Sequence, residues 1–380
     1  MPEPKRALIV VNGLNEPSGT VRAAQYQPYF ERSQQWRASF ISRRSQKWTH
    51  RTNRTYRPTA PLIVPLIHRP VASYNRRWER RREDEIVRQA AAVDLVYLVK
   101  IPALALYQRL RALNGPVVIA DFNDALWLPA FQNGGWQDWD TVLETAHGVI
   151  CENGYVAGYA KRHNANVCVV PDSPQIELYD RQRSAGLRQP GRIVVGWIGS
   201  PENAGSLHRI FEPLEDVSRR VPGLHVRIVG ADRASLPRFE KVQWSCLPSY
   251  RQPDMIRETI GFDVGLFPMF HTEEGLARGN LKAMIYMSAG AAALCEDYGE
   301  NRSLIEDGVN GALAATSEQW ARKLEWLATD HTSRQRLAQC GTETIRRRFS
   351  GEVVFAQLED AFTRLWTAAR ADLHAVAAPS

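Results

Sequence analysis

The sequence has few cysteines for its length and no spacing that would pair them. Five occur among 380 residues, an odd number without a CxxC pair, and most stand within or beside apolar runs. Disulfide frameworks and zinc sites need an even or closely spaced set, whereas a free cysteine behaves as a small apolar side chain. The pattern therefore predicts reduced core thiols and no metal site. The five residues are Cys151, Cys168, Cys246, Cys295 and Cys340.

A long apolar run is also missing. No stretch approaches the about 18 apolar residues of a membrane-spanning helix. The N-terminus passes from a short polar segment directly into a strand pattern, without the apolar region of a signal peptide. We therefore expect a cytoplasmic protein, with peripheral contact at the inner face of a membrane as an open alternative.

The positive charge of the chain is concentrated in one region. Residues 32–88 hold fifteen Lys and Arg against four Asp and Glu, a local charge of +11, whereas the whole chain carries +7 and the remainder therefore −4. Aromatic residues are interleaved with the arginines, as in surfaces that bind nucleic acid, anionic lipid or an anionic small molecule. A solvated arginine-rich helix face is the equally weighted alternative. We expect no nucleic-acid partner, because no nucleic-acid-binding fold surrounds the region.

Length and periodicity predict two α/β domains. A chain of 380 residues exceeds what one core usually supports, and its 44% hydrophobic content excludes disorder. Continuous apolar strands at 6–12, 94–100, 116–120 and 192–198 alternate with helical segments, which is typical of doubly wound parallel sheets. Two of the expected helices cover 21–32 and 203–221.

A polar stretch divides the chain. Residues 172–191 hold two prolines and two glycines and few periodic apolar positions, which indicates an interdomain linker. We therefore expect two domains, at 1–171 and 192–350, and a final helix at 351–380.

The most informative stretch lies at 263–311. A buried strand at 263–267 runs into a glycine-containing loop, a helix begins at Gly279 or Asn280, and a short apolar strand leads into a second glycine-bearing loop. In a parallel sheet both loops lie at the carboxyl ends of their strands, where a helix N-terminus presents free N–H groups. The stretch therefore predicts a phosphate-binding site.

This stretch resembles the donor-binding core of retaining glycosyltransferases of the GT-B fold, family 4 (glycosyl transferases group 1). The chain differs from that family at Ala277 and Ile285, where many members have two glutamates eight positions apart, the second of which binds the donor ribose. The residues that carry the resemblance are Lys282, Tyr286, Met287, Ser288, Gly290, Gly299, Asn301, Arg302, Leu304, Ile305, Asp307, Gly308, Asn310 and Gly311.

The segment GWIGSP at 196–201 is the second resemblance. Many members follow this glycine with an Arg and a Lys that clamp the diphosphate, but Ser200, Glu202 and Asn203 stand here instead. Backbone N–H groups with Lys282 or Arg278 must then meet the phosphate charge. The resemblance implies these donor-binding residues: Gly199, Ser200, Pro201, Arg278, Gly279, Asn280, Leu281, Lys282, Glu300 and Asn301.

The first domain carries a third resemblance, in DFNDALW at 121–127. It implies that Asp121, Asn123 and Asp124 contact sugar hydroxyls, and we assign catalytic roles to them together with Glu274 of the acidic loop. Capping of the following turn is the competing role for the aspartates. An acceptor-side loop is expected at Gly13, Ser18 and Gly19.

A DxD pair, Asp138 and Asp140, has the spacing of a divalent-metal site. Both residues stand at the start of an expected amphipathic helix, where acidic side chains complement the helix dipole. We therefore predict no metal site here.

The resemblance implies the fold class and the activity together. The fold is α/β, with two doubly wound Rossmann-like domains facing across a cleft (GT-B). The resemblance implies an N-terminal acceptor-side domain at 1–171 and a nucleotide-sugar-binding domain at 192–350. It also implies that the C-terminal helix, 351–380, crosses back onto the first domain. The activity is retaining, metal-independent transfer of a sugar from a nucleotide-diphosphate sugar to an acceptor hydroxyl, with no cofactor. The acceptor could be a small molecule, a glycan or a lipid-linked glycan, and an anionic acceptor is one alternative. A catalytically silent sugar-nucleotide-binding protein, and another GT-B enzyme such as a nucleotide-sugar 2-epimerase, stay open.

Overall fold

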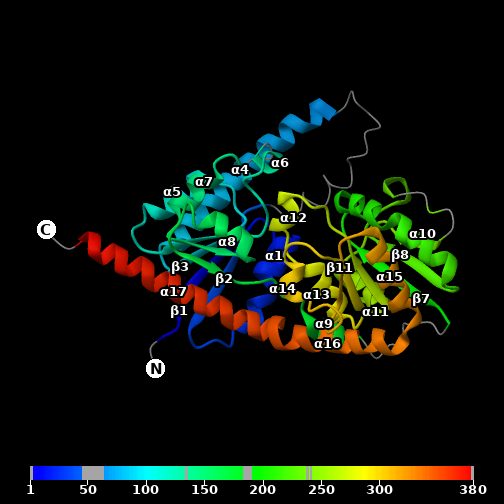
Figure 1. The fold of residues 1–380 in the computed structure, drawn as a ribbon. Helices are drawn as coiled ribbons and strands as arrows, with labels where there is room; N and C mark the ends of the chain where they lie inside the picture. Colours follow the sequence, from blue (N-terminus) through cyan, green and yellow to red (C-terminus); the bar gives the residue numbers. More distant parts are fainter. Residues whose placement is uncertain are drawn as a thin grey trace. The chain divides into compact units, whose positions relative to one another are not determined.

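The chain forms two compact units, shown in the computed structural model of Figure 1. The structure describes residues 3–44, 64–132, 136–182, 191–236, 239 and 242–377. Unit 1 comprises Met1–Pro171 with Phe355–Ser380, and unit 2 comprises Asp172–Val354. The expected linker at 172–191 contains a helix of unit 2, α9 (Ile176–Asp180), and its residues 183–190 lie outside the described part.

Unit 1 is built on a six-stranded parallel sheet of order β2-β1-β3-β4-β5-β6. The neighbouring strands β1 and β3 are buried over their paired residues, and all of these are apolar or aromatic, as expected when helices cover both faces of a sheet. The strands are β1 (Lys5–Val11), β2 (Trp36–Ser42), β3 (Leu95–Val99), β4 (Val117–Phe122), β5 (Gly148–Cys151) and β6 (Val167–Val169).

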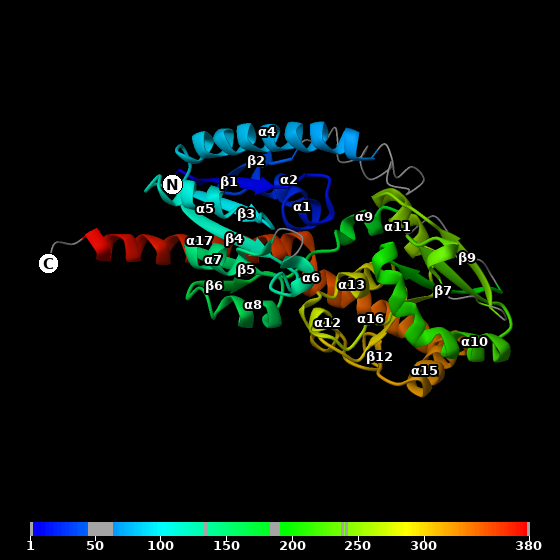
Figure 2. The same ribbon diagram turned by 90° about the horizontal axis from the view of Figure 1, so that it is seen from above.

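Helices lie on both sides of this sheet (Figure 2). They are α1 (Pro17–Arg22), α2 (Gln27–Phe30), α4 (Val64–Ala90), α5 (Leu104–Arg111), α6 (Pro129–Phe131), α7 (Trp139–Thr145), α8 (Gly154–Ala160) and, from Phe355 onward, α17 (Gly351–Ala377). The prediction of a single helix at 21–32 was wrong, because α1 ends at Arg22, a 3-10 turn η1 (Ala24–Tyr26) follows, and α2 is a separate helix. Pro28 has no N–H for a continuous helix and fits only the first turn of α2.

Unit 2 repeats the design with strand order β12-β11-β10-β7-β8-β9, again all parallel. The two sheets confirm the predicted fold class of two doubly wound α/β units. The strands are β7 (Ile193–Ile198), β8 (Leu224–Val229), β9 (Gln243–Leu247), β10 (Val264–Phe267), β11 (Ala292–Glu296) and β12 (Ala312–Ala314).

One predicted helix of unit 2 is also divided. Residues 203–221 were expected as one helix, but a 3-10 helix, η4 (Pro201–Ile210), precedes α10 (Phe211–Arg220). Pro213 would lack its hydrogen bond inside a longer α-helix, and it is accommodated in the first turn of α10. The other helices are η5 (Arg233–Ser235), α11 (Gln252–Ile260), α12 (Glu273–Ala277), α13 (Leu281–Ser288), α14 (Asn301–Leu304), α15 (Ser317–Thr329) and α16 (His331–Phe349).

The C-terminal helix α17 supplies part of the unit 1 core. Phe355 packs edge-on against Phe30 at 4.8 Å between ring centroids, and Phe362 packs against Tyr97 at 5.0 Å. Trp36 of β2 donates from its indole to Thr363 at 3.0 Å. Burying rings of this size contributes much of the stability of a core, so these contacts fix the helix to the sheet.

Some arginines of the basic region, residues 32–88, are held by contacts within unit 1. Arg43 pairs with Glu79 and Glu83 of α4, at 3.2 and 2.8 Å, and Arg82 donates to the Ser42 carbonyl at 3.1 Å. Residues 45–63 lie outside the described part. Arg77, Arg80 and Arg81 are exposed on α4. Among the described residues, no helix is both long and apolar enough to cross a bilayer.

Candidate functional site

Each sheet has one switch point, where the strand order reverses direction. It lies between β1 and β3 in unit 1, and between β7 and β10 in unit 2. In open α/β sheets, ligands bind beyond the carboxyl ends of the strands at this point. In each unit, the candidate binding residues are therefore those that follow the two strands at its switch point.

In unit 2, the hydroxyl of Tyr286 keeps the switch point open. The pairing of β7 with β10 stops at Gly196 and Gly265. Beyond them the Tyr286 hydroxyl accepts from the Ile198 N–H and donates to the Leu266 carbonyl, both at 3.0 Å. A Cβ on Gly265 would lie 2.1 Å from the Tyr286 ring, so only glycine lets α13 approach this closely.

Gly199, directly after β7, is enclosed by two side chains. A Cβ placed on it would lie 2.4 Å from the Trp197 ring and 3.0 Å from Nζ of Lys282. Nζ lies 4.8 Å from the centroid of the Trp197 ring and 5.3 Å from that of Phe267. The aromatic faces therefore hold the ammonium group of Lys282 beside the backbone of Gly199.

Lys282 is a half-buried cation, and no carboxylate or hydrogen-bond acceptor of the described residues pairs with it. Burial, followed by the positive charge of Arg278, lowers the pKa of Lys282 to about 7. A buried ammonium without a counter-ion is unfavourable in the isolated protein. An anionic ligand would therefore gain affinity from this group.

The N-terminus of α13 lies at the same point. Asn280 precedes the helix, but its side chain makes no cap and instead donates to the Glu300 carbonyl at 3.1 Å. The first amide groups of α13 are thus not capped by Asn280 and carry the positive end of the helix dipole. Gly279 and Leu281 flank this position and are half-buried.

Arg278 connects the two halves of the site. It donates to Asn203 Oδ1, and Asn203 in turn donates to Ser200 Oγ at 3.0 Å. Its second partner is Glu274, at 2.5 Å. Glu274, which the sequence predicts to be catalytic, therefore forms an ion pair with Arg278. This pairing favours a role for Glu274 in orienting the Arg278 side chain. Pro201 lies next to Ser200, exposed, as the first residue of η4.

Asn301 does not fit its predicted role in donor binding. Its side chain is 1% exposed and donates to the Glu296 carbonyl at 3.0 Å and to Met269 Sδ at 3.3 Å. It therefore holds two loops together from inside the core. Glu300 is half-buried and accepts from Ser303 Oγ at 2.9 Å.

In unit 1, Asp121 is a structural residue. It is 0% exposed, and its carboxylate accepts from Arg22 Nη2 at 2.5 Å, from Arg22 Nε at 3.1 Å and from the Tyr97 hydroxyl at 2.7 Å. A carboxylate enclosed in this way cannot contact a sugar. The sequence motif concealed this, because Arg22 lies 99 positions away.

The other residues of the motif lie at the switch point of unit 1. Asp124 pairs with Nζ of Lys100, and Lys100 adopts a left-handed backbone with φ of 53°. Asn12, at the end of β1, donates to the Lys100 carbonyl at 2.9 Å. Oδ1 of Asn12 and Oδ1 of Asn123 are buried and lack partners among the described residues. These atoms can accept hydrogen bonds from a hydroxyl-rich ligand.

Sequence reasoning missed Asn12 and Lys100. Part of the evidence is present in the sequence, since Asn12 directly follows β1 and Lys100 directly follows β3. Their pairing depends on β1 lying beside β3, which the sequence leaves open.

The expected acceptor-side loop is partly helical. Gly13 lies in a loop, but Ser18 and Gly19 belong to α1. A Cβ on Gly19 would lie 2.1 Å from the Gly13 carbonyl oxygen, so the glycine serves close packing of α1 on this loop. This packing role accounts for the glycine at position 19, and no ligand contact is needed to explain it.

One residue of the DxD pair, Asp140, has a structural partner. Asp138 precedes α7, and Asp140 in its first turn accepts from the Tyr159 hydroxyl. Within the described ranges, no group of three or more His, Cys, Asp or Glu side chains is placed to hold a metal ion.

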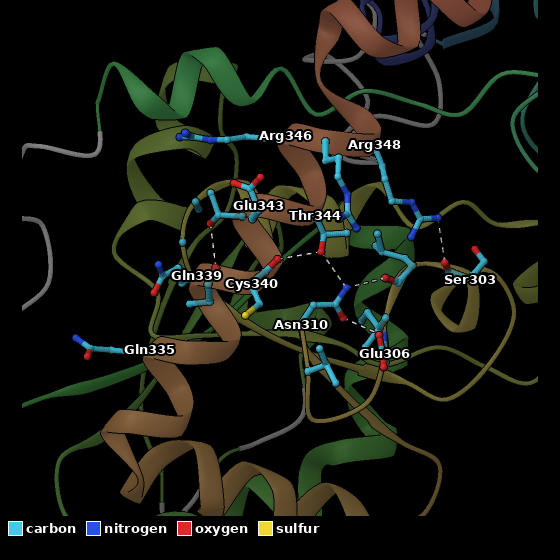
Figure 3. A pocket seen from close by; sticks show the side chains of 18 of the residues that line it. Ser303, Glu306, Asn310, Gln335, Gln339, Cys340, Glu343, Thr344, Arg346 and Arg348 are labelled. Atoms are coloured by element: carbon cyan, nitrogen blue, oxygen red, sulfur yellow. Dashed lines mark hydrogen bonds between the residues drawn. The ribbon is translucent and has the colours of Figure 1, made fainter.

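A separate hollow of about 1490 Å³ lies in unit 2 beside α16 (Figure 3). Ile260 and Gly290, which line it, come just before β10 and β11, so it lies at the amino ends of the strands. Asn310 accepts there from the Glu306 N–H and donates to Thr344, at 2.9 and 3.2 Å. These bonds stabilise the turn, and the hollow is not part of the switch-point site.

Comparisons with known proteins agree with this architecture. Residues 192–330 match the family model of glycosyl transferases group 1. No curated protein matches the sequence.

Solved structures similar to the chain share its fold over nearly the whole length. HepE from Anabaena with UDP-glucose has a TM-score of 0.66 at 15% identity, covering 94% of this chain and 99% of its own. Sucrose-phosphate synthase from Thermosynechococcus elongatus has 0.63 at 13% identity, covering 96% and 100%. Trehalose 6-phosphate synthase from Burkholderia multivorans has 0.63 at 12% identity, covering 100% and 99%. Residues 192–330 therefore match a glycosyl transferases group 1 model, within a chain that shares the GT-B fold of these structures.

Proposed function

We propose that the protein moves a sugar from a nucleoside-diphosphate sugar to an acceptor hydroxyl, with retention at the anomeric carbon and without a metal ion. The observation that carries this proposal is Lys282, whose half-buried, uncompensated ammonium lies beside Gly199 near the start of α13. A diphosphate would supply the missing negative charge and accept from the helix amides. UDP-glucose, bound in the HepE structure, is a reasonable first donor to test.

The reaction then needs little from side-chain carboxylates. The bond between the anomeric carbon and the phosphate oxygen breaks as the acceptor oxygen bonds the same carbon on the same face. The acceptor proton passes to an oxygen of the leaving diphosphate. Lys282, with Arg278 and the amides of α13, would stabilise the charge that develops on that leaving group.

Unit 1 would hold the acceptor at its own switch point. Asn12 and Asn123 present buried oxygens that have no partner in the part of the chain that the structure describes, and Lys100 and Asp124 add a charged pair. Hydroxyl groups of a sugar or polyol match both features. A small molecule, a glycan and a lipid-linked glycan all offer such groups.

A catalytically silent sugar-nucleotide-binding protein is the second candidate. It is favoured by Ala277 and Ile285, which are both buried and apolar at positions where a ribose or sugar contact was expected. The ion pair between Glu274 and Arg278 also lowers the net positive charge of the site. Turnover separates the two candidates, because only an enzyme releases the nucleoside diphosphate.

The test uses Lys282→Met, which keeps an apolar stem against Trp197, and Lys282→Ala, which removes it. Lys161→Met, at an exposed position of unit 1, is the control. We expect both Lys282 variants to bind UDP at least about tenfold more weakly, the usual effect of losing a charge-assisted contact. Turnover of mass-tagged UDP-glucose is followed in parallel, with and without EDTA. Unchanged UDP affinity in Lys282→Met would refute the site, and loss of turnover with EDTA would refute metal independence.

A further inference from the structure

A second polar network lies at the carboxyl edge of unit 2, next to the Lys282 site. Glu296, the last residue of β11, has a fully buried side chain. Arg209 of η4 donates to it twice, at 2.7 and 3.3 Å, and His271 Nε2 lies 3.0 Å from Glu296 Oε1. A buried carboxylate is tolerated when it is paired and hydrogen-bonded in this way.

The network fixes the orientation of His271. Because the carboxylate can only accept, Nε2 carries the proton, and Nδ1 of the neutral ring is an acceptor. The ring stacks on Tyr298, with centroids 4.4 Å apart and planes 11° apart. Tyr298 in turn donates to the Thr272 carbonyl at 3.1 Å. The side chain of His271 is 42% exposed, and Nδ1 has no partner among the described residues.

The backbone on either side of His271 is held as well. The Met269 N–H donates to Glu296 Oε2 at 3.3 Å, and Asn301 donates to Met269 Sδ at 3.3 Å. The loop after β10 is therefore tied to β11 and α14 at several points. Such support holds an exposed group in one place, which is what a binding contact requires.

His271 lies near the proposed diphosphate position. Its stacking partner Tyr298 is two residues from Glu300, a span of at most about 7 Å. The carbonyl of Glu300 accepts from Asn280, which precedes α13. Phe270, next to His271, is 50% exposed, and a Cβ added to Gly205 in η4 would lie 3.9 Å from its ring. Phe270, His271 and Tyr298 thus combine aromatic surface with one free acceptor, a composition typical of small-molecule sites.

We propose that His271 binds the transferred sugar, with Nδ1 accepting a hydrogen bond from a sugar hydroxyl, and that Glu296 and Arg209 are positioning residues. This inference rests on the proposed donor site, because a sugar joined to a diphosphate at α13 lies at this edge of the sheet. It assigns the sugar contact to His271 and not to Glu274, which follows it in the same connection after β10 and is paired with Arg278.

Two matched variants separate the ring nitrogens. His271→Gln keeps an amide that can donate to Glu296 as Nε2 does, but it loses the group at the Nδ1 position. His271→Asn keeps a polar group near the Nδ1 position and cannot reach Glu296. Calorimetry measures the affinities of each variant for UDP-glucose and for UDP, with GDP-mannose and GDP as a second pair.

We expect His271→Gln to weaken binding of the nucleotide sugar by about tenfold and to leave the bare nucleoside diphosphate unchanged, so that the ratio of the two affinities falls. The ratio should fall less in His271→Asn than in His271→Gln. Glu296→Gln should lower the ratio as well, whereas general destabilisation would lower both affinities together. The inference is overturned if His271→Gln leaves the ratio at its wild-type value while Lys282→Met still weakens UDP. Wild-type protein that binds neither UDP nor GDP would overturn the proposed function and this inference together.

Discussion

The ammonium nitrogen of Lys282 lies 4.8 Å from the centroid of the Trp197 ring, and it would lie 3.0 Å from a Cβ at position 199. The cation and the ring come from α13 and β7, so their contact joins the two elements that form the proposed phosphate site. Gly199 is required by this contact, and it is itself buried, with its N–H donating to the Val229 carbonyl at 3.0 Å.

Gly199→Ala should damage both the fold and the site. The added Cβ would lie 2.4 Å from the Trp197 ring, and moving that buried ring should cost about 1 to 3 kcal/mol of the free energy of unfolding. UDP binding should weaken as Lys282 is displaced. Gly158→Ala is the control, since nothing lies within 4 Å of its Cβ and it stands inside α8. Urea unfolding and calorimetry measure both effects, and equal stability of the two variants would contradict the prediction.

The affinity for UDP should depend on pH through Lys282. Its pKa of about 7 in the folded protein lies below the ordinary value of about 10.4. The unfolded chain therefore binds more protons between these values, and Lys282 makes stability rise with pH across that window. UDP prefers the ammonium form, so its affinity should fall as pH rises from about 7 to about 9. Lys282→Met should abolish most of this dependence, and an equally steep fall in that variant would exclude Lys282 as its source.

Tyr286→Phe should destabilise unit 2 by about 1 to 3 kcal/mol. The change leaves the Ile198 N–H and the Leu266 carbonyl buried without partners. Tyr107→Phe is the matched control, because the Tyr107 hydroxyl is buried and has no partner among the described residues. We expect that control to be neutral or stabilising. The difference in urea midpoint between the two variants is the measurement, and a zero difference would refute the bridging role.

Asp121→Ala should lower stability by about 3 to 5 kcal/mol, because Arg22 would be left as an uncompensated buried charge. The exposed pair of Asp360 and Arg364, 4.0 Å apart, provides the control, and Asp360→Ala should change stability by less than about 1 kcal/mol. Thermal unfolding distinguishes the two. A variant at position 121 that keeps wild-type stability but loses turnover would restore the catalytic assignment.

The exposed arginines of α4 should influence an anionic acceptor. Replacing Arg77, Arg80 and Arg81 by Gln should raise the apparent KM of the acceptor and flatten its salt dependence, because surface charge acts over about 8 to 10 Å at physiological salt. Donor affinity should not change. The same replacement at three exposed arginines of unit 2, Arg322, Arg336 and Arg347, controls for net charge. A wild-type KM that does not vary with salt would exclude this electrostatic effect.

The sequence alone determined the central strands and the fold class, and it predicted a phosphate site around Lys282. Buried parallel strands have continuous apolar sequences, as in β3 and in residues 117–120 of β4, because helices cover both faces of the sheet. The segment around Lys282 was also predictable, because a strand, a loop and the start of a helix are each indicated by residues within a few positions of one another. The helix breaks before Pro28 and Pro213 could have been predicted in the same way, but one continuous helix was expected in each place.

Only the tertiary structure decided which polar side chains are free to bind. Asp121 resembles a catalytic residue in the sequence, but Arg22 reaches it across 99 positions and removes it from solvent. His271 carries no motif, and its orientation depends on Glu296, 25 positions later on the neighbouring strand. Pairings of this kind depend on strand order and on the approach of helices to the sheet. Charge and hydrogen-bond partners are therefore set by contacts that the local pattern of residues does not specify.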